Sequence, residues 1–289
     1  MKIVLYSSQL ASFIGRNPHT IASKIFNKLY ENNFSNELQK LKVYDQLKKN
    51  NVGDGKLIDE IANKMENNQN LRINLDKICN NNISTIIIKK EQEELVKKVM
   101  SDKNLNENDK EILKKAIDGY TNKKFGTVKE KNAIDVYRIR TGEEVVTKID
   151  SRCKKIAEYD GIELLLISKI DAIKTDGTIL EIKNRMYKLF EEVREYEWLQ
   201  VQAYLEVYNL EKAELIEYLK TGEGEMRINE INRDHRFWNE IVLKEVNFYF
   251  KTLVNMMRNE TRFKKYFALS ETEQNELIKK MVRKETKEK

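Results

Sequence analysis

The chain is poor in the residues that build disulfide frameworks and histidine sites: its 289 residues include two cysteines, two histidines and one proline. Cys79 and Cys153 are too few for a disulfide framework or for a four-cysteine zinc or iron–sulfur site. We therefore expect both to be reduced thiols. His19 and His235 lie away from the motifs described below, which argues against a histidine-metal site and against Cys/His nucleophilic catalysis.

Long apolar runs are also lacking. No stretch approaches the roughly 18 residues that a membrane span needs, and the first residues lack the apolar core, about 7–15 residues long, of a secretory signal. We therefore expect an intracellular protein without membrane association. No glycine-rich phosphate loop with a Walker-type lysine is present, so ATP-driven work by this chain is not expected.

Charge, in contrast, is abundant. Lys and Arg total 53 against 47 Asp and Glu, which gives a net charge of +6. This mild bias allows a polyanionic partner such as nucleic acid but does not require one. Apolar residues are spread along the whole length, so we expect a folded chain rather than a disordered one.

The hydrophobic pattern divides the chain into three regions within one expected domain. Residues 18–122 show helical stripes separated by asparagine-rich breaks, which predicts a mainly helical subdomain. Residues 123–256 alternate strands with helices, and residues 257–289 should form C-terminal helices with a basic tail. The fold expected is α/β, with a central mixed sheet flanked by helices. In the central region we expect helices at 123–140 and 196–208 and strands at 144–149, 155–159, 162–173, 178–183, 213–219 and 225–231.

One hairpin carries the strongest chemical pattern. An apolar strand from Ile162 ends near Asp171, and the returning strand carries Glu181 and Lys183, which point to one face because their spacing is two residues. The turn determines whether Asp171 shares that face. A two-residue loop at 176–177 would pair Asp171 with Ile182, whereas a three-residue loop at 175–177 would pair it with Glu181. The sequence allows both loops.

The three-residue loop would bring two carboxylates and an ammonium group together, a set suited to phosphodiester hydrolysis. Such hydrolysis needs a metal to generate hydroxide near neutral pH, and the developing charge needs stabilisation. Asp171, Glu181 and the backbone carbonyl of Ile182 offer the oxygen ligands that Mg²⁺ or Mn²⁺ prefers. Lys183 would orient water or stabilise charge. The alternative interpretation is a solvated hairpin on which Glu181 and Lys183 form an ordinary ion pair.

Two helices flank the hairpin in sequence. Glu130 shares an apolar stripe with Ile134 and Tyr137 and should face inward, although Thr127 and Glu130 also match a capping box at a helix start. That helix should end at Gly142. In the later helix, Gln200 and Tyr204 share a face. The alternative for that helix is ordinary amphipathic packing.

The ordered set of these motifs resembles the lambda-type (YqaJ-like) exonucleases. This is the recombination and alkaline-exonuclease branch of the PD-(D/E)xK, or restriction-endonuclease-like, superfamily. The resemblance covers residues 7–17 and about 123–256 and looks most like versions from large DNA viruses. It rests on Ser7-Ser8 with Gly15, Gly126-x₃-Glu130, Thr141-Gly142, Asp171-x₉-Glu181-x-Lys183 and Gln200-Val-Gln202.

The resemblance implies a role for each matching residue. Asp171 and Glu181 would ligate Mg²⁺ or Mn²⁺, and Lys183 would be the catalytic lysine. Glu130 would complete the metal shell or hold the attacking water, and Gln200 would contact an active-site acid or lysine, with Tyr204 behind it.

Ser8 sits where the family binds a 5′-terminal phosphate. The family's arginine for that phosphate lies upstream of the serine segment, so Arg16 or a lysine elsewhere would have to substitute. The residue before Asp171 is Ile170, where the superfamily motif has proline.

The function implied is a Mg²⁺-dependent deoxyribonuclease, digesting duplex ends 5′→3′ and leaving 3′ single strands for recombination and repair. Its partners would be double-stranded DNA ends and a single-strand annealing protein, in the cytoplasm or at a viral replication site, and ring-like homo-oligomers occur in the family. Two alternatives stay open: an endonuclease or repair nuclease of the same superfamily, and a non-catalytic nucleic-acid-binding scaffold.

Overall fold

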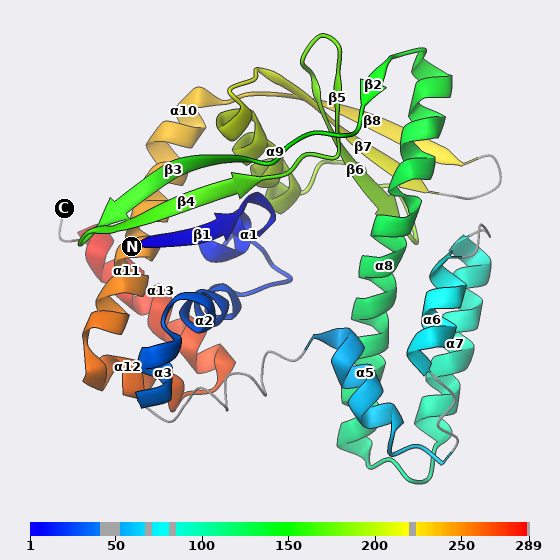
Figure 1. Ribbon diagram of the computed structural model, residues 1–289, viewed down its shortest axis with the longest axis horizontal. Coiled ribbons are helices and arrows are strands. Elements are labelled where there is room, and N and C mark those ends of the chain that lie inside the picture. Colours follow the sequence, from blue (N-terminus) through cyan, green and yellow to red (C-terminus); the bar gives the residue numbers. More distant parts are fainter. Residues whose placement is uncertain (41–52, 67–70, 81–84, 220–223, 288–289) are drawn as a thin grey trace.

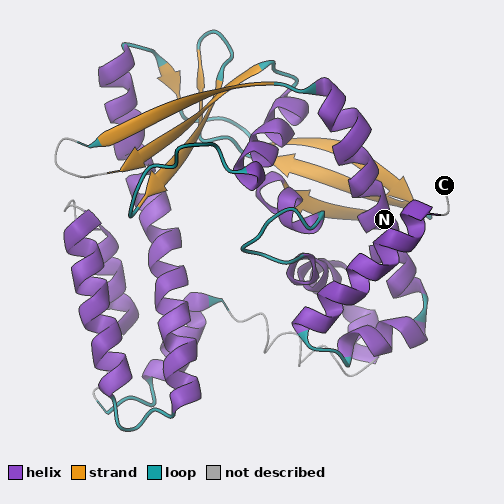
Figure 2. Ribbon diagram, turned by 180° about the vertical axis from the view of Figure 1, so that it is seen from behind, coloured by secondary structure: helices purple, strands orange, loops and turns teal. Residues whose placement is uncertain are grey.

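The computed structural model describes residues 1–40, 53–66, 71–80, 85–219 and 224–287. It has an α/β architecture in which two mixed β-sheets are flanked by helices (Figures 1 and 2). The first sheet has three strands in the order β1 (Lys2–Tyr6), β4 (Ile162–Ser168) and β3 (Arg152–Tyr159). β1 runs parallel to β4, and β3 runs antiparallel to it. The expected α/β class is therefore confirmed.

The second sheet has five strands and contains the central catalytic candidates. Its order is β2 (Val145–Val146), β5 (Ala172–Lys174), β6 (Ile179–Arg185), β7 (Lys212–Leu219) and β8 (Glu225–Asn232). β6 and β7 are parallel, and the other neighbours are antiparallel. In the described residues the strands are thus divided between two mixed sheets, where the sequence predicted a central one.

The strand expected at 162–173 is divided between these sheets. β4 ends at Ser168, whose hydroxyl contacts Ser7 and whose carbonyl accepts a hydrogen bond from the Tyr208 hydroxyl at 3.2 Å. Ile170, buried in the main core, follows before β5 begins. Ile170 is apolar because it packs in the core between the two strands, so the hydrophobic pattern alone could not show where β4 ends and β5 begins.

The two faces of β6 are covered by two different helices. Leu180 and Ile182 pack with Ala133 and Ile134 of α8 (Glu107–Thr141). The alternate residues of β6 face α9 (Glu195–Tyr208), which connects β6 to the parallel strand β7. The site therefore lies between a central strand and its crossover helix.

α8 is a single helix of 35 residues that joins the five-stranded sheet to a separate helical unit (Figure 1). The expected helix start near residue 123 was wrong: Gly126 and Thr127 lie inside α8, so Thr127 is no cap. Packing at both ends outweighs the cost of about 1 kcal/mol for an internal glycine. The expected C-cap is confirmed, because Gly142 has a φ of 72°.

The helical unit consists of α5 (Asp54–Ala62), α6 (Leu71–Asn80), α7 (Thr85–Ser101) and the first half of α8. It has its own apolar cluster, which includes Ile58, Leu75, Val99 and Leu113.

The remaining helices pack with the three-stranded sheet in the largest core. They are α1 (Ser7–Phe13), α2 (Ala22–Asn33), α3 (Ser35–Lys40), α10 (His235–Phe237), the π-helix η1 (Trp238–Val242), α11 (Leu243–Arg258), α12 (Glu260–Phe267) and α13 (Glu271–Lys287). Among the helices of the described residues, none is long and apolar enough to cross a bilayer.

Candidate active site

The turn between β5 and β6 settles the position of Asp171. Lys174 donates its backbone N–H to the Thr178 carbonyl at 2.9 Å, which closes a three-residue loop. Gly177 has a φ of +88°, a left-handed conformation in which glycine is favoured. Ala172 pairs with Leu180, so the next position along places Asp171 opposite Glu181. The structure therefore has the loop that the chemistry requires.

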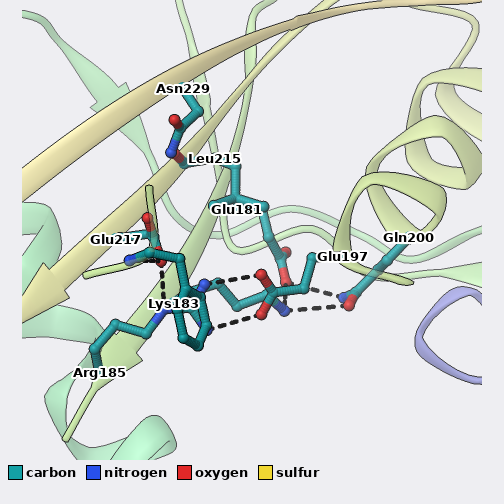
Figure 3. Close-up of polar contacts among 9 residues, drawn as sticks. Glu181, Lys183, Arg185, Glu197, Gln200, Leu215, Glu217 and Asn229 are labelled. Carbon is teal, nitrogen blue, oxygen red and sulfur yellow. Dashed lines mark hydrogen bonds and ion pairs between the residues drawn. The ribbon is translucent and has the colours of Figure 1, made fainter. Parts of the chain in front are cut away.

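Glu181 lies at the centre of the site and is only 3% exposed. Its Oε1 accepts hydrogen bonds from Lys183 Nζ at 2.7 Å and from Gln200 Nε2 at 2.9 Å (Figure 3). Its Oε2 is buried and makes no hydrogen bond to the described residues. A buried carboxylate oxygen without a partner is costly, and Glu217 Oε2 on the neighbouring strand shares this property, so the unpartnered oxygen alone does not single out Glu181.

Two further carboxylates converge on Glu181. Asp171 Oδ2 accepts a hydrogen bond from the backbone N–H of Ile182 at 2.8 Å. Burial and then the charge of Glu181 raise the pKa of Asp171 to about 9. Burial and the charge of Glu181 also raise the pKa of Glu130, against an opposing effect of Lys169. Glu130 is itself half-buried, and its stripe partners Ile134 and Tyr137 are buried.

Lys183 is the cation at this cluster. Its ammonium group also donates to Gln200 Oε1 at 3.1 Å. Burial lowers the pKa of Lys183, but the charge of Glu181 and the hydrogen bond to it outweigh burial, and the net shift is upward. Lys183 is therefore a charged donor near neutral pH, suited to stabilising negative charge rather than to removing a proton.

Gln200 connects the acid, the lysine and a buried tyrosine. Its Nε2 also lies within hydrogen-bonding reach of the Tyr204 hydroxyl, one turn further along α9. Burial, followed by the charge of Glu181, raises the pKa of Tyr204 well above its usual range. Tyr204 therefore stays neutral and supports Gln200 from behind.

The donor set fits a hard divalent cation. The cluster holds three carboxylates, and Glu181 presents a buried oxygen without a partner. Within the described ranges, however, no three His, Cys, Asp or Glu side chains stand close enough to hold a metal together. Asp171 and Glu181 are the residues that would hold Mg²⁺ or Mn²⁺, with the Ile182 carbonyl as a further oxygen.

Comparison with known proteins gives only a distant structural likeness. No family model matches the chain, and no curated protein matches its sequence. The solved structure of SSO0001 is 14% identical, with a TM-score of 0.37 over 47% of this chain and 62% of that chain. An alkaline exonuclease from Laribacter hongkongensis, LHK-Exo, is 15% identical, with a TM-score of 0.38 over 64% of this chain and 88% of its own. The complex of LHK-Exo with dAMP gives a TM-score of 0.39. All three TM-scores lie below 0.5, so we infer no activity from them.

Ser8 and Arg16 lie on or after α1, which packs on α9. Ser8 is exposed, and no described contact joins it to the carboxylates. Arg16 is held by other partners: its guanidinium bonds Glu245 Oε1 and Oε2 at 2.6 and 2.7 Å and Glu195 at 2.6 Å. These contacts raise the pKa of Arg16 further. The structure thus brings together Glu130, Asp171, Glu181, Lys183, Gln200 and Tyr204, but not Ser8 or Arg16.

A second charged cluster, which the sequence reasoning missed, lies beside the first on β6. Arg185 contacts Glu197 of α9 through two bonds of 2.8 Å and Glu217 of β7 through one of 2.6 Å (Figure 3). Both carboxylates are buried. The signal was present in the sequence, because Arg185 continues the alternation of Glu181 and Lys183 and Glu197 precedes Gln200 by three residues.

Proposed function

We propose that this chain is a metal-dependent deoxyribonuclease that hydrolyses phosphodiester bonds at the cluster around Glu181. The observation that carries the proposal is the gathering of Asp171, Glu130 and Lys183 around the buried Glu181 carboxylate. Lys183 and Gln200 hold one Glu181 oxygen, the other is buried without a partner among the described residues, and the charge of Glu181 acts on Asp171. An ion pair on an ordinary solvated hairpin would be exposed and would not gather two further acids.

Each residue has a definite task in this proposal. Asp171 and Glu181 would hold Mg²⁺ or Mn²⁺, which when bound supplies Lewis acidity toward water and the phosphate. Lys183 donates to the negative charge that develops on the phosphate oxygens. Gln200 holds the side chains of Glu181 and Lys183 in position through its hydrogen bonds to both, and Tyr204 supports Gln200. Glu130 would hold the attacking water; to complete the metal shell it would have to move closer, because no three acidic side chains of the described residues lie close enough to share a metal.

The finer proposal is an exonuclease of the lambda-type branch within the PD-(D/E)xK superfamily. It would digest duplex ends 5′→3′ and leave 3′ single strands for recombination and repair, alongside a single-strand annealing protein. Residues 123–256 would carry the catalysis, with 18–122 as a helical subdomain and 257–289 as C-terminal helices and tail. Ser8 would contact the 5′ phosphate; Arg16 would first have to exchange its carboxylate partners. We also propose that the chain assembles as a homo-oligomer.

The test is a duplex labelled at one 5′ or one 3′ end, incubated with wild type and with Lys183→Ala, with and without Mg²⁺. Labelled mononucleotide released from the 5′ end only, in wild type with Mg²⁺ only, supports the whole proposal. Internal cuts or nicking of a closed circle would favour an endonuclease. If wild type is inert on duplex ends, nicked circles and single strands, in Mg²⁺ and in Mn²⁺, the nuclease proposal is wrong. The function that remains is then a non-catalytic, nucleic-acid-binding scaffold.

A further inference from the structure

The loop that follows β6 exposes an aromatic ring close to the candidate site. Tyr187 is 63% exposed, although β6 ends two residues earlier at Arg185. Tyr187 lies four positions after Lys183, so the two Cα atoms are at most about 14 Å apart. A nucleic-acid strand a few nucleotides long would therefore be long enough to contact both residues.

The base of this loop is anchored to the helical unit. Met186 packs against Ile78 of α6 and Ile88 of α7, two buried residues that form a small cluster apart from the main core of that unit. This contact joins residues more than 90 positions apart in the sequence. The ring of Tyr187 therefore stands beside a fixed neighbour rather than on an unsupported loop.

A lysine from the helical unit completes the arrangement. The Nζ of Lys89, on α7, lies 4.7 Å from the centroid of the Tyr187 ring. Lys89 is exposed, and its described contact is with this ring. One face of the ring thus receives a cation, and the ammonium group keeps the capacity to bind an anion.

We propose that Tyr187 and Lys89 form a binding platform for single-stranded DNA, with a nucleobase stacked on the open face of the ring and a phosphate at Lys89. The proposal rests on the nuclease function proposed above and adds a substrate contact to it. An aromatic ring with a neighbouring cation matches a nucleotide, which joins a flat base to a negative phosphate. At a rise of about 3.4 Å per nucleotide, a base on Tyr187 would lie within about four nucleotides of a phosphate at Lys183.

The experiment measures binding in EDTA, where hydrolysis does not interfere. The probes are fluorescein-labelled dT12 and an abasic oligomer with the same number of phosphates. Tyr187→Ala should weaken binding of dT12 by about 5–150-fold, the usual loss for one stacked base, and should leave the abasic oligomer unaffected. Tyr187→Phe should bind dT12 like wild type, because the π face is kept. Lys89→Gln should weaken both probes and reduce the salt dependence by about one phosphate contact.

The control is Ile139→Ala, which removes an 83% exposed apolar side chain near the end of α8 and should change neither probe. Wild type that fails to bind dT12, Tyr187→Ala that binds dT12 like wild type, or an equal loss on the abasic oligomer would each overturn the platform. Mg²⁺-dependent cleavage by wild type is scored separately. If dT12 binding depends on Tyr187 while wild type cleaves nothing, the platform stands and the nuclease function falls.

Discussion

Two charged clusters lie side by side on one face of β6, and they differ in how their charges are balanced. At Arg185, a guanidinium spans two buried carboxylates, Glu197 and Glu217, through three hydrogen bonds. At Glu181, the ammonium group of Lys183 meets one carboxylate oxygen, and the charge of Glu181 raises the pKa values of the neighbouring Asp171 and Glu130. The first arrangement joins β6, α9 and β7. The second holds Asp171 protonated near neutral pH, and a bound cation would favour the ionised form of that carboxyl group.

The comparison teaches that a buried acid is not by itself a functional one. Glu217 is 1% exposed and Glu181 is 3% exposed, so burial does not separate them. In both residues Oε1 is hydrogen-bonded, and Oε2 is buried without a partner among the described residues. The difference lies in the neighbours: Glu217 shares a guanidinium with Glu197, whereas Glu181 lies beside Asp171 and Glu130 and raises the pKa of each. Variants at the two clusters should therefore lose different properties.

The largest effect expected is on turnover at the Glu181 cluster. Lys183→Ala should reduce kcat on duplex DNA by about 10³-fold, because it removes the donor aimed at the developing charge. Binding of the same duplex in EDTA should be nearly unchanged, since many contacts hold the phosphates. Single-turnover rates and fluorescence anisotropy measure the two quantities. A variant that binds poorly but turns over normally when saturated would assign Lys183 to substrate binding alone.

The opposite pattern is expected at Arg185. Arg185→Ala should lower the free energy of unfolding by about 3–5 kcal/mol, because it leaves two buried carboxylates without their cation. Urea unfolding measures this loss, and Lys183→Ala is the matched comparison, since Glu181 keeps its bond to Gln200. Equal destabilisation by the two variants would remove the distinction between a structural and a functional cluster.

A smaller effect is expected at Gln200. Gln200→Ala should reduce turnover by about 10–100-fold, the range found for residues that orient a metal ligand without touching the metal. The loss should appear as a higher Mg²⁺ concentration for half-maximal rate, because Glu181 loses one of its two donors. Gln202→Ala is the control from the same helix, since that side chain bonds Asn232 and Asp234 instead. Unchanged Mg²⁺ dependence in Gln200→Ala would contradict the positioning role.

The smallest effect expected is a gain in stability. Asp171 has a pKa of about 9 in the folded protein against 3.8 ordinarily, so its contribution to stability is present near pH 4 and is lost as pH rises through 9. In EDTA at pH 8, Asp171→Asn should raise the free energy of unfolding by about 1 kcal/mol or more, because one pKa unit corresponds to about 1.4 kcal/mol. The two proteins should converge near pH 4. A variant less stable than wild type at pH 8 would contradict the cost of ionising Asp171, which comes from its burial and from the charge of Glu181.

The sequence predicted the chemistry of β6 better than the path of the chain around it. Strict alternation placed Glu181 and Lys183 on one face, and β7 and β8 differ from the expected strands by one residue at one end. The turn could not be chosen from sequence, because both loop lengths accept Gly177. β1 was missed, since five residues paired in parallel with a distant strand leave no local signal. Arg185 was overlooked because the strand was expected to end at residue 183, whereas β6 continues to Arg185.

The measurement that tests the central claim most directly is Mn²⁺ binding by isothermal titration calorimetry, in the absence of DNA. Wild type should bind Mn²⁺, and both Glu181→Gln and Asp171→Asn should lose that binding by at least about 10-fold. Glu217→Gln, which removes an equally buried carboxylate from the neighbouring cluster, should bind like wild type once circular dichroism shows that it is folded. Binding that survives Glu181→Gln, or that is lost equally in Glu217→Gln, would contradict the assignment of the cation site to Glu181 and Asp171.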